Sequence, residues 1–108
     1  MRCVIIESPY AGNIERNVKY AREAMWDCLQ RGEAPYASHL LYTQVGVLDD
    51  SDPIQRERGI QAGFAWRSAS QATVVYEDLG ISTGMKYGIE HAKKLGHPIE
   101  YRKLKGWQ

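Results

Sequence analysis

Residues 73–84 read TVVYEDLGISTG and contain, in order, a β-branched and aromatic run, an acidic pair and a glycine- and serine-containing turn. The first run is typical of a buried β-strand, and Ser82 is a good N-cap for a helix that follows the turn. A strand that leads through a short turn into a helix is half of a β-α-β unit. This stretch therefore predicts a parallel sheet with helices packed against it.

The rest of the chain repeats this alternation of strand and helix. Apolar runs of strand length are separated by segments with helical spacing, and residues 39–50 read as a loop with one helical turn near Leu40. Gly96 and Pro98 end the last helix, as is usual at a helix C-terminus. The expected strands are residues 3–6, 34–38, 73–76 and 99–103, and the expected helices begin at the N-cap candidates Asn13, Asp52 and Ser82.

These elements predict an α/β fold in a single domain that spans residues 1–108. We expect a small three-layer sandwich, flavodoxin-like or Rossmann-like, with a mainly parallel sheet of four to five strands and right-handed crossovers. The length fits one domain, and 44% hydrophobic and 25% charged residues are ordinary for a folded globular protein.

The net charge and the cysteine content indicate which partners and which cellular compartment to expect. A formal net charge of +1 argues against a protein that coats nucleic acid, so we expect no nucleic-acid polymer as partner. Cys3 and Cys28 both lie in apolar patterns and predict buried, reduced thiols. We find no signal peptide, membrane span or zinc-ligand spacing, and we expect a cytoplasmic protein that needs neither a metal nor a cofactor.

In open parallel sheets, ligands bind beyond the carboxyl ends of the strands, where the strand order reverses. This rule selects three segments of the chain as candidates for a site. They are residues 7–12, Ser38-His39 and residues 77–84.

The turn of residues 80–84 is a candidate anion site. A loop that opens a helix presents free backbone N–H groups and the positive end of the helix dipole, which suit a phosphate or a carboxylate. Ser82 and Thr83 can add hydroxyl donors. The alternative is that Gly80 and Gly84 only permit a tight turn and close helix packing.

The loop from Ser8 to Gly12 supplies further candidates at the end of the first strand. Tyr10 could stack on a base or hydrogen-bond a sugar, or it could be a half-buried aromatic residue with its hydroxyl group in water. Glu7 could serve as a general acid or base, or pair with a basic neighbour such as Arg16. Arg16 lies in the first turn of the following helix and is the cation that we expect nearest the anion site.

Other titratable residues flank the same strand ends. His39 could move a proton near neutral pH or have a purely structural hydrogen-bonding role. Glu77 and Asp78 end a strand, so one should point toward the site and the other away from it. His91 and His97 read as surface residues of the last helix and its end.

Three large aromatic residues favour burial either in the core or between subunits. They are Trp26, Trp66 and Tyr87. Because a small sandwich has limited core space for so many large aromatic residues, we expect some of them to be buried in the interface of a homodimer or a higher homo-oligomer.

The chain resembles nucleoside 2-deoxyribosyltransferase-like proteins, which include 2′-deoxynucleoside 5′-phosphate N-hydrolases and small, often phage-encoded members. The resemblance rests on residues 6–17, which read IESPYAGNIERN, and on Gly32, Pro35 and Ser38-His39. It continues through residues 72–78, the turn of Ser82-Thr83-Gly84 and residues 96–99. It therefore covers nearly the whole chain.

The resemblance implies cleavage of the N-glycosidic bond of a deoxynucleoside or its monophosphate. It implies a glutamate nucleophile on the last helix, a first-loop tyrosine that orients it and an acidic residue after the third strand. Tyr10 matches the tyrosine, Glu77 or Asp78 matches the acid, and Ser82 and Gly84 match the phosphate-binding turn.

The position of the implied nucleophile carries no carboxylate in this chain. The pattern places it six residues after Ser82, where Gly88 stands. Glu90 is the nearest carboxylate on the helix, but residues two apart are about 200° apart around a helix axis. Glu7 is the other candidate, because related first loops usually carry a small residue there.

Two functions therefore stay open. One is an N-glycosidic hydrolase or deoxyribosyltransferase that acts on a nucleoside or a nucleoside monophosphate. The other is a non-catalytic nucleotide-binding protein that has lost the helix glutamate, as Gly88 favours. In both cases the partner is a small nucleoside or nucleotide and not a membrane.

Overall fold

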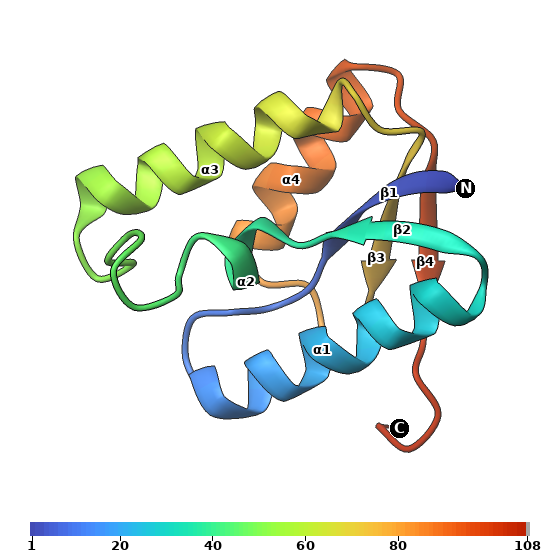
Figure 1. Cartoon of the computed structure of the whole chain (residues 1–108), viewed down its shortest axis with the longest axis horizontal. Helices are drawn as coiled ribbons and strands as arrows, with labels where there is room; N and C mark the ends of the chain where they lie inside the picture. The colour runs from blue at the N-terminus through green and yellow to red at the C-terminus, as the bar shows by residue number, and fades with distance from the viewer. Residues whose placement is uncertain (108) are drawn as a thin grey trace.

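Four parallel strands form the centre of the molecule, and a helix follows each of the first three. The computed structural model describes residues 1–107. The sheet has the order β2-β1-β3-β4, and every neighbouring pair of strands is parallel (Figure 1). The strands are β1 (Arg2–Glu7), β2 (Glu33–Tyr36), β3 (Ala72–Tyr76) and β4 (Ile99–Arg102), and the helices are α1 (Ile14–Gln30), α2 (Ser38–Leu41), α3 (Pro53–Arg67) and α4 (Thr83–Lys94).

Side chains alternate along each strand between two different helix layers. Val4 and Ile6 of β1 pack in one core cluster with Tyr20 and Cys28 of α1. On the opposite face, Val75 of β3 packs with residues of α4. The sheet is therefore the middle of three layers, as the sequence predicts, with α1 on one face and α4 on the other.

The predicted helix starts are confirmed by their caps. The side chain of Asn13 accepts a hydrogen bond from the Arg16 N–H group, and that of Asp52 accepts one from the Ile54 N–H group. Pro53 occupies the first position of α3, where a missing N–H group costs nothing. The helical turn expected near Leu40 is the short helix α2.

One expectation about burial is wrong, and one of the two alternatives of a second is excluded. Cys3 is exposed, and only Cys28 is a buried thiol. Trp26, Trp66 and Tyr87 are exposed by 64%, 52% and 62%, so none of them belongs to the core of the described residues. Their place in a subunit interface stays a prediction.

The connections place a reversal of strand order beside β1. The chain leaves β1 through α1 to reach β2, then crosses back over β1 through α3 to reach β3 on its other side. Ligands in such sheets bind outside the strand ends at this reversal. The loop after β1 and the first turn of α4 both lie there.

Within residues 1–107, no helix is both long enough and apolar enough to cross a membrane.

Candidate functional site

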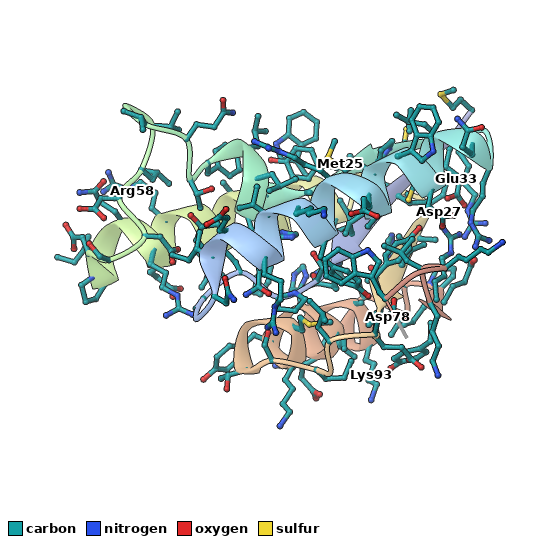
Figure 2. The ribbon with its side chains drawn as sticks, turned by 90° about the horizontal axis from the view of Figure 1, so that it is seen from below. Met25, Asp27, Glu33, Arg58, Asp78 and Lys93 are labelled. Atoms are coloured by element: carbon teal, nitrogen blue, oxygen red, sulfur yellow. The ribbon has the colours of Figure 1, made fainter. Side chains whose placement is uncertain are left out.

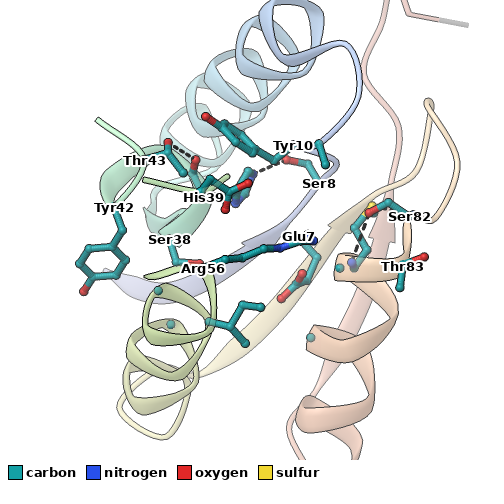
Figure 3. A pocket seen from close by; sticks show the side chains of 18 of the residues that line it. Glu7, Ser8, Tyr10, Ser38, His39, Tyr42, Thr43, Arg56, Ser82 and Thr83 are labelled. Atoms are coloured by element: carbon teal, nitrogen blue, oxygen red, sulfur yellow. Dashed lines mark hydrogen bonds between the residues drawn. The ribbon is translucent and has the colours of Figure 1, made fainter. Parts of the chain in front are cut away.

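A cavity of about 550 Å³ lies at the reversal of strand order. Its wall is formed by the end of β1 and the loop after it, by α2, by one side of α3 and by the first turns of α4 (Figure 3). The sequence-selected residues that line it are Glu7, Ser8, Tyr10, Gly12, His39, Ser82, Thr83 and Gly84. The structure thus brings together the first loop, His39 and the start of the last helix.

Glu7 points to the α3 and α4 side of the sheet. It lies two residues after Ile5, which also lines the cavity, so the alternation of β1 sends both side chains to the same face. Its carboxyl group fills the space beside the Cα atom of Gly88 on α4. A Cβ atom built at Gly88 would overlap all three atoms of this carboxyl group, with Oε1 only 2.5 Å away. In this position, the carboxyl group of Glu7 therefore leaves no room for a side chain at position 88.

Glu7 is paired with a buried cation. Nη2 of Arg67, at the end of α3, donates a hydrogen bond to Oε2 of Glu7. Burial raises the pKa of Glu7 to about 7, although the positive charge and the hydrogen bond of Arg67 act in the opposite direction. Near neutral pH the carboxyl group can therefore be present in both its charged and its neutral form.

The first loop and α2 meet through a second pair of side chains. Oγ of Ser8 lies 2.7 Å from Nε2 of His39, and Figure 3 shows this bond beside Tyr10. Burial lowers the pKa of His39 to about 4, so its imidazole is neutral at pH 7. A neutral imidazole can donate or accept a hydrogen bond, which suits a polar heterocycle better than an anion.

The first turn of α4 forms the wall opposite α2. The hydroxyl group of Ser82 accepts a hydrogen bond from the Met85 N–H group, 3.3 Å away, so it caps the helix. Thr83 and Gly84 follow it, and a Cβ atom at Gly84 would meet nothing within 4 Å. The backbone of this turn is therefore open to close approach by a ligand.

Five other predicted residues lie outside the cavity lining. Asp78 belongs to the α1 side, because its Oδ2 atom accepts hydrogen bonds from the Tyr20 hydroxyl group at 2.6 Å and the Leu104 N–H group at 2.8 Å. Gly80 has a φ of +85°, so it serves the turn. Arg16, Glu77, Asp78, Gly80 and Glu90 do not line the cavity.

The structure adds residues that sequence reasoning missed. Arg56 and Arg67 both line the cavity, and neither is among the residues selected from the sequence. Both lie on the side of α3 that carries Gly59 and Gly63. A Cβ atom at Gly63 would lie 2.8 Å from Oγ of Ser38. The repeat of small residues four apart, followed four residues later by Arg67, is the signal that could have identified this face.

Comparisons with known proteins agree with this architecture. The model of one protein family, described as Domain of unknown function (DUF7768), matches residues 2–102. The chain belongs to this family. A search of the curated proteins found no match.

Among the solved structures that match this DUF7768 protein, one illustrates the shared fold. It is a 2-deoxyribosyltransferase from the psychrotolerant bacterium Bacillus psychrosaccharolyticus, with a TM-score of 0.70 and 14% sequence identity. The match covers 96% of this chain and 74% of the other. The two proteins therefore have the same α/β fold.

Proposed function

We propose that this protein cleaves the N-glycosidic bond of a deoxynucleoside or of its monophosphate, with Glu7 as the nucleophile. The base would be released to water or exchanged for another base. The observation that carries this proposal is the position of the Glu7 carboxylate. It lies against Gly88, the helix position where the family resemblance implies a glutamate. The same site would thus receive its carboxylate from a strand and not from a helix.

Nucleophilic attack on the anomeric carbon requires one accessible carboxylate oxygen. Oε2 of Glu7 binds Arg67, whereas Oε1 accepts no hydrogen bond from any of the described residues. Oε1 would form a bond to the anomeric carbon while the bond from that carbon to the base nitrogen breaks. The bonding electrons leave with the base, which takes up a proton from water. Water or a second base then attacks the anomeric carbon and releases the carboxylate.

The other cavity residues have roles that fit this substrate class. Tyr10 and the pair of Ser8 and His39 line the part of the cavity between the first loop and α2, where a base or a sugar could be bound. Phosphate would bind at the open first turn of α4. Arg56 lines the same cavity and forms no ion pair within the described chain, so it is the cation available for that phosphate.

The direct test is to incubate the protein with the four common deoxynucleosides and with their 5′-monophosphates and to measure the released base by chromatography. Glu7→Gln should lower the rate by about 10³-fold or more, because an amide cannot form the covalent intermediate. Glu90→Gln is the matched control, since Glu90 is exposed and lies outside the cavity. Full activity of the Glu7→Gln variant would exclude Glu7 as the nucleophile.

A carboxylate exchange tests the assignment further. Glu7→Ala should be inactive, and Gly88→Glu alone should place two carboxyl groups in one space. The double variant Glu7→Ala/Gly88→Glu returns a carboxylate to the helix and should recover about tenfold or more over Glu7→Ala. Activity of the double variant no higher than that of Glu7→Ala would contradict the equivalence of the two positions.

A non-catalytic nucleotide-binding protein is the second candidate. The observation that favours it is the ion pair of Glu7 with Arg67, which gives the carboxylate a purely structural partner. A ligand that binds only the folded state raises the melting temperature. A thermal shift with deoxynucleoside monophosphates, without any release of base, would favour this second function.

A further inference from the structure

Arg67 is a buried cation, and each of its three guanidinium nitrogens has a hydrogen-bond partner. Only 1% of its surface is exposed. Its Nε atom donates to Oγ1 of Thr73 at 3.1 Å, its Nη1 atom lies 3.1 Å from Nδ1 of His91, and its Nη2 atom binds Oε2 of Glu7. These acceptors come from β3, α4 and β1, so the guanidinium group joins three elements around the inner end of the cavity.

The direction of these hydrogen bonds is fixed by chemistry. A guanidinium group only donates, so Nδ1 of His91 must accept and must be unprotonated. The ring of His91 stacks on Phe64, with centroids 4.0 Å apart and an angle of 5° between the planes. Burial and the charge of Arg67 both lower the pKa of His91, which keeps the ring neutral. His91 is therefore held in one orientation, with its lone pair directed at Arg67.

Thr73 is held in the same way from the other side. Nε2 of His97 lies 2.9 Å from the Ser70 carbonyl oxygen, which can only accept, so His97 donates there. Nδ1 of His97 lies 2.9 Å from the hydroxyl group of Thr73, and the Thr73 oxygen accepts a hydrogen bond from Arg67. Arg67 therefore joins two branches of hydrogen bonds: one runs through Thr73 and His97 to the Ser70 carbonyl oxygen, and the other ends on Glu7.

We propose that Arg67 is the positioning residue of the Glu7 carboxylate and that His91 sets its orientation. This inference rests on the proposed function, because it assigns a role to groups behind the nucleophile. Arg67 binds one carboxylate oxygen and leaves the other facing the cavity. Its positive charge also favours the ionised form of the carboxyl group, against the effect of burial. His91 does not touch the cavity and acts only through Arg67.

The test measures the ionisation of Glu7 directly and needs no enzymatic activity. Protein labelled with ¹³C at the glutamate side-chain carboxyl groups is titrated by NMR, and the Glu7 signal is assigned by its loss in Glu7→Gln. The other titratable groups around the cavity are Tyr10, His39, Tyr42, Asp50 and Arg56, which stay unchanged in every variant. The signal of the exposed Glu90 is the internal reference.

Three variants separate the effect of the Arg67 charge on Glu7 from the effect of the orientation of Arg67. Arg67→Met should move the Glu7 midpoint upward by about one pH unit or more, because the nearby positive charge is lost. His91→Phe keeps the stack on Phe64 but removes the acceptor, and it should give a smaller upward shift. His91→Gln restores an acceptor and should return the midpoint toward the wild-type value. If Arg67→Met is poorly folded, the comparison of His91→Phe with His91→Gln still tests whether His91 acts on Glu7 through Arg67.

The two proposals can fail separately. An unchanged Glu7 midpoint in Arg67→Met, or in His91→Phe where Arg67→Met does not fold, would overturn the positioning role even if base is released. The expected shifts without release of base would support the arrangement and contradict the proposed function. In an active protein, His91→Phe should lower kcat more than it changes KM, and an effect on KM alone would contradict positioning.

Discussion

Within residues 1–107, two glutamate–arginine pairs are buried, and the pKa values of their carboxyl groups are shifted in opposite directions. Glu33 receives two hydrogen bonds from Arg102, each 2.8 Å long. These bonds and the positive charges near it hold the pKa of Glu33 below its ordinary value. Glu7 receives one bond from Arg67, and desolvation raises its pKa to about 7. Arg102 thus binds both carboxylate oxygens of Glu33, whereas Arg67 binds only one oxygen of Glu7.

The surroundings of the two pairs explain this difference. Arg102 also contacts the hydroxyl group of Tyr76, which donates to Asp27 of α1 at 2.7 Å. Figure 2 shows Asp27 and Glu33 close together at one end of α1, and neither residue lines the cavity. Glu7 instead borders an open cavity and faces a glycine. The following experiments use this contrast.

The largest expected effect is the loss of stability when the ion pair of Glu33 and Arg102 is broken. We call this pair the structural pair. Arg102→Met leaves the carboxylate of Glu33 without its main partner and should lower the free energy of unfolding by about 3–5 kcal/mol. Denaturant unfolding measures this loss. The double variant Glu33→Gln/Arg102→Met removes both charges and should lose less than the sum of the single variants. Additive losses would show that the two residues do not stabilise the fold as a pair.

The pH dependence of stability should have opposite signs at the two sites. Unfolded Glu7 releases its proton near 4.5, whereas folded Glu7 releases it near 7. Between these values the folded state binds the extra proton, so the Glu7 contribution is full below pH 4.5 and is lost as the pH rises to 7. This loss is about 3 kcal/mol for a shift of this size. The stabilising contribution of Glu33 is instead present above pH 4.5 and is lost as the pH falls.

Unfolding of the wild type and of Glu7→Gln at pH 4.5 and pH 7 measures the Glu7 effect. The wild type should lose stability relative to the variant as the pH rises. A constant difference between the two proteins would mean that Glu7 titrates as an ordinary exposed glutamate.

An added side chain should destabilise the protein more at position 88 than at position 84, one helical turn earlier. Gly88→Ala places a methyl group on the Glu7 carboxyl group and should cost about 1–3 kcal/mol, because Arg67 holds that group in place. Gly84→Ala is the matched control on the same helix, since its methyl group would meet open space. Thermal unfolding compares the two variants. Equal stability of both would show that Glu7 moves aside freely.

The fold could be predicted because local chemistry determined its elements. Asn13, Asp52 and Ser82 cap helices as their residue types predict, and the apolar runs at residues 3–6 and 73–76 are strands of the sheet. The cavity position also followed, because parallel strands with this connectivity place the first loop beside the last helix.

The side-chain network behind Glu7 could not be predicted, because it joins distant parts of the chain. His91 and His97 read as surface residues, but both contact partners 24 residues away in sequence, Arg67 and Thr73. Glycine occupies positions 59 and 63 on the inner side of α3, so the helix shows little hydrophobic pattern there. The alternation of Glu77 and Asp78 showed that they point apart but not which one faces Tyr20.

The smallest expected effect lies at the exposed edge of the structural pair. Glu100 also binds Arg102, with 3.0 Å between Oε1 and Nη2, but 40% of its side chain is exposed. Hydrogen bonds from Arg2 and Arg102 hold the pKa of Glu100 below its ordinary value, yet water screens an exposed pair. Glu100→Gln should therefore cost less than about 1 kcal/mol and should cost less still in high salt. A loss as large as that of Arg102→Met would mean that Glu100, and not Glu33, is the main partner of Arg102, and the contrast between two buried pairs would then fail.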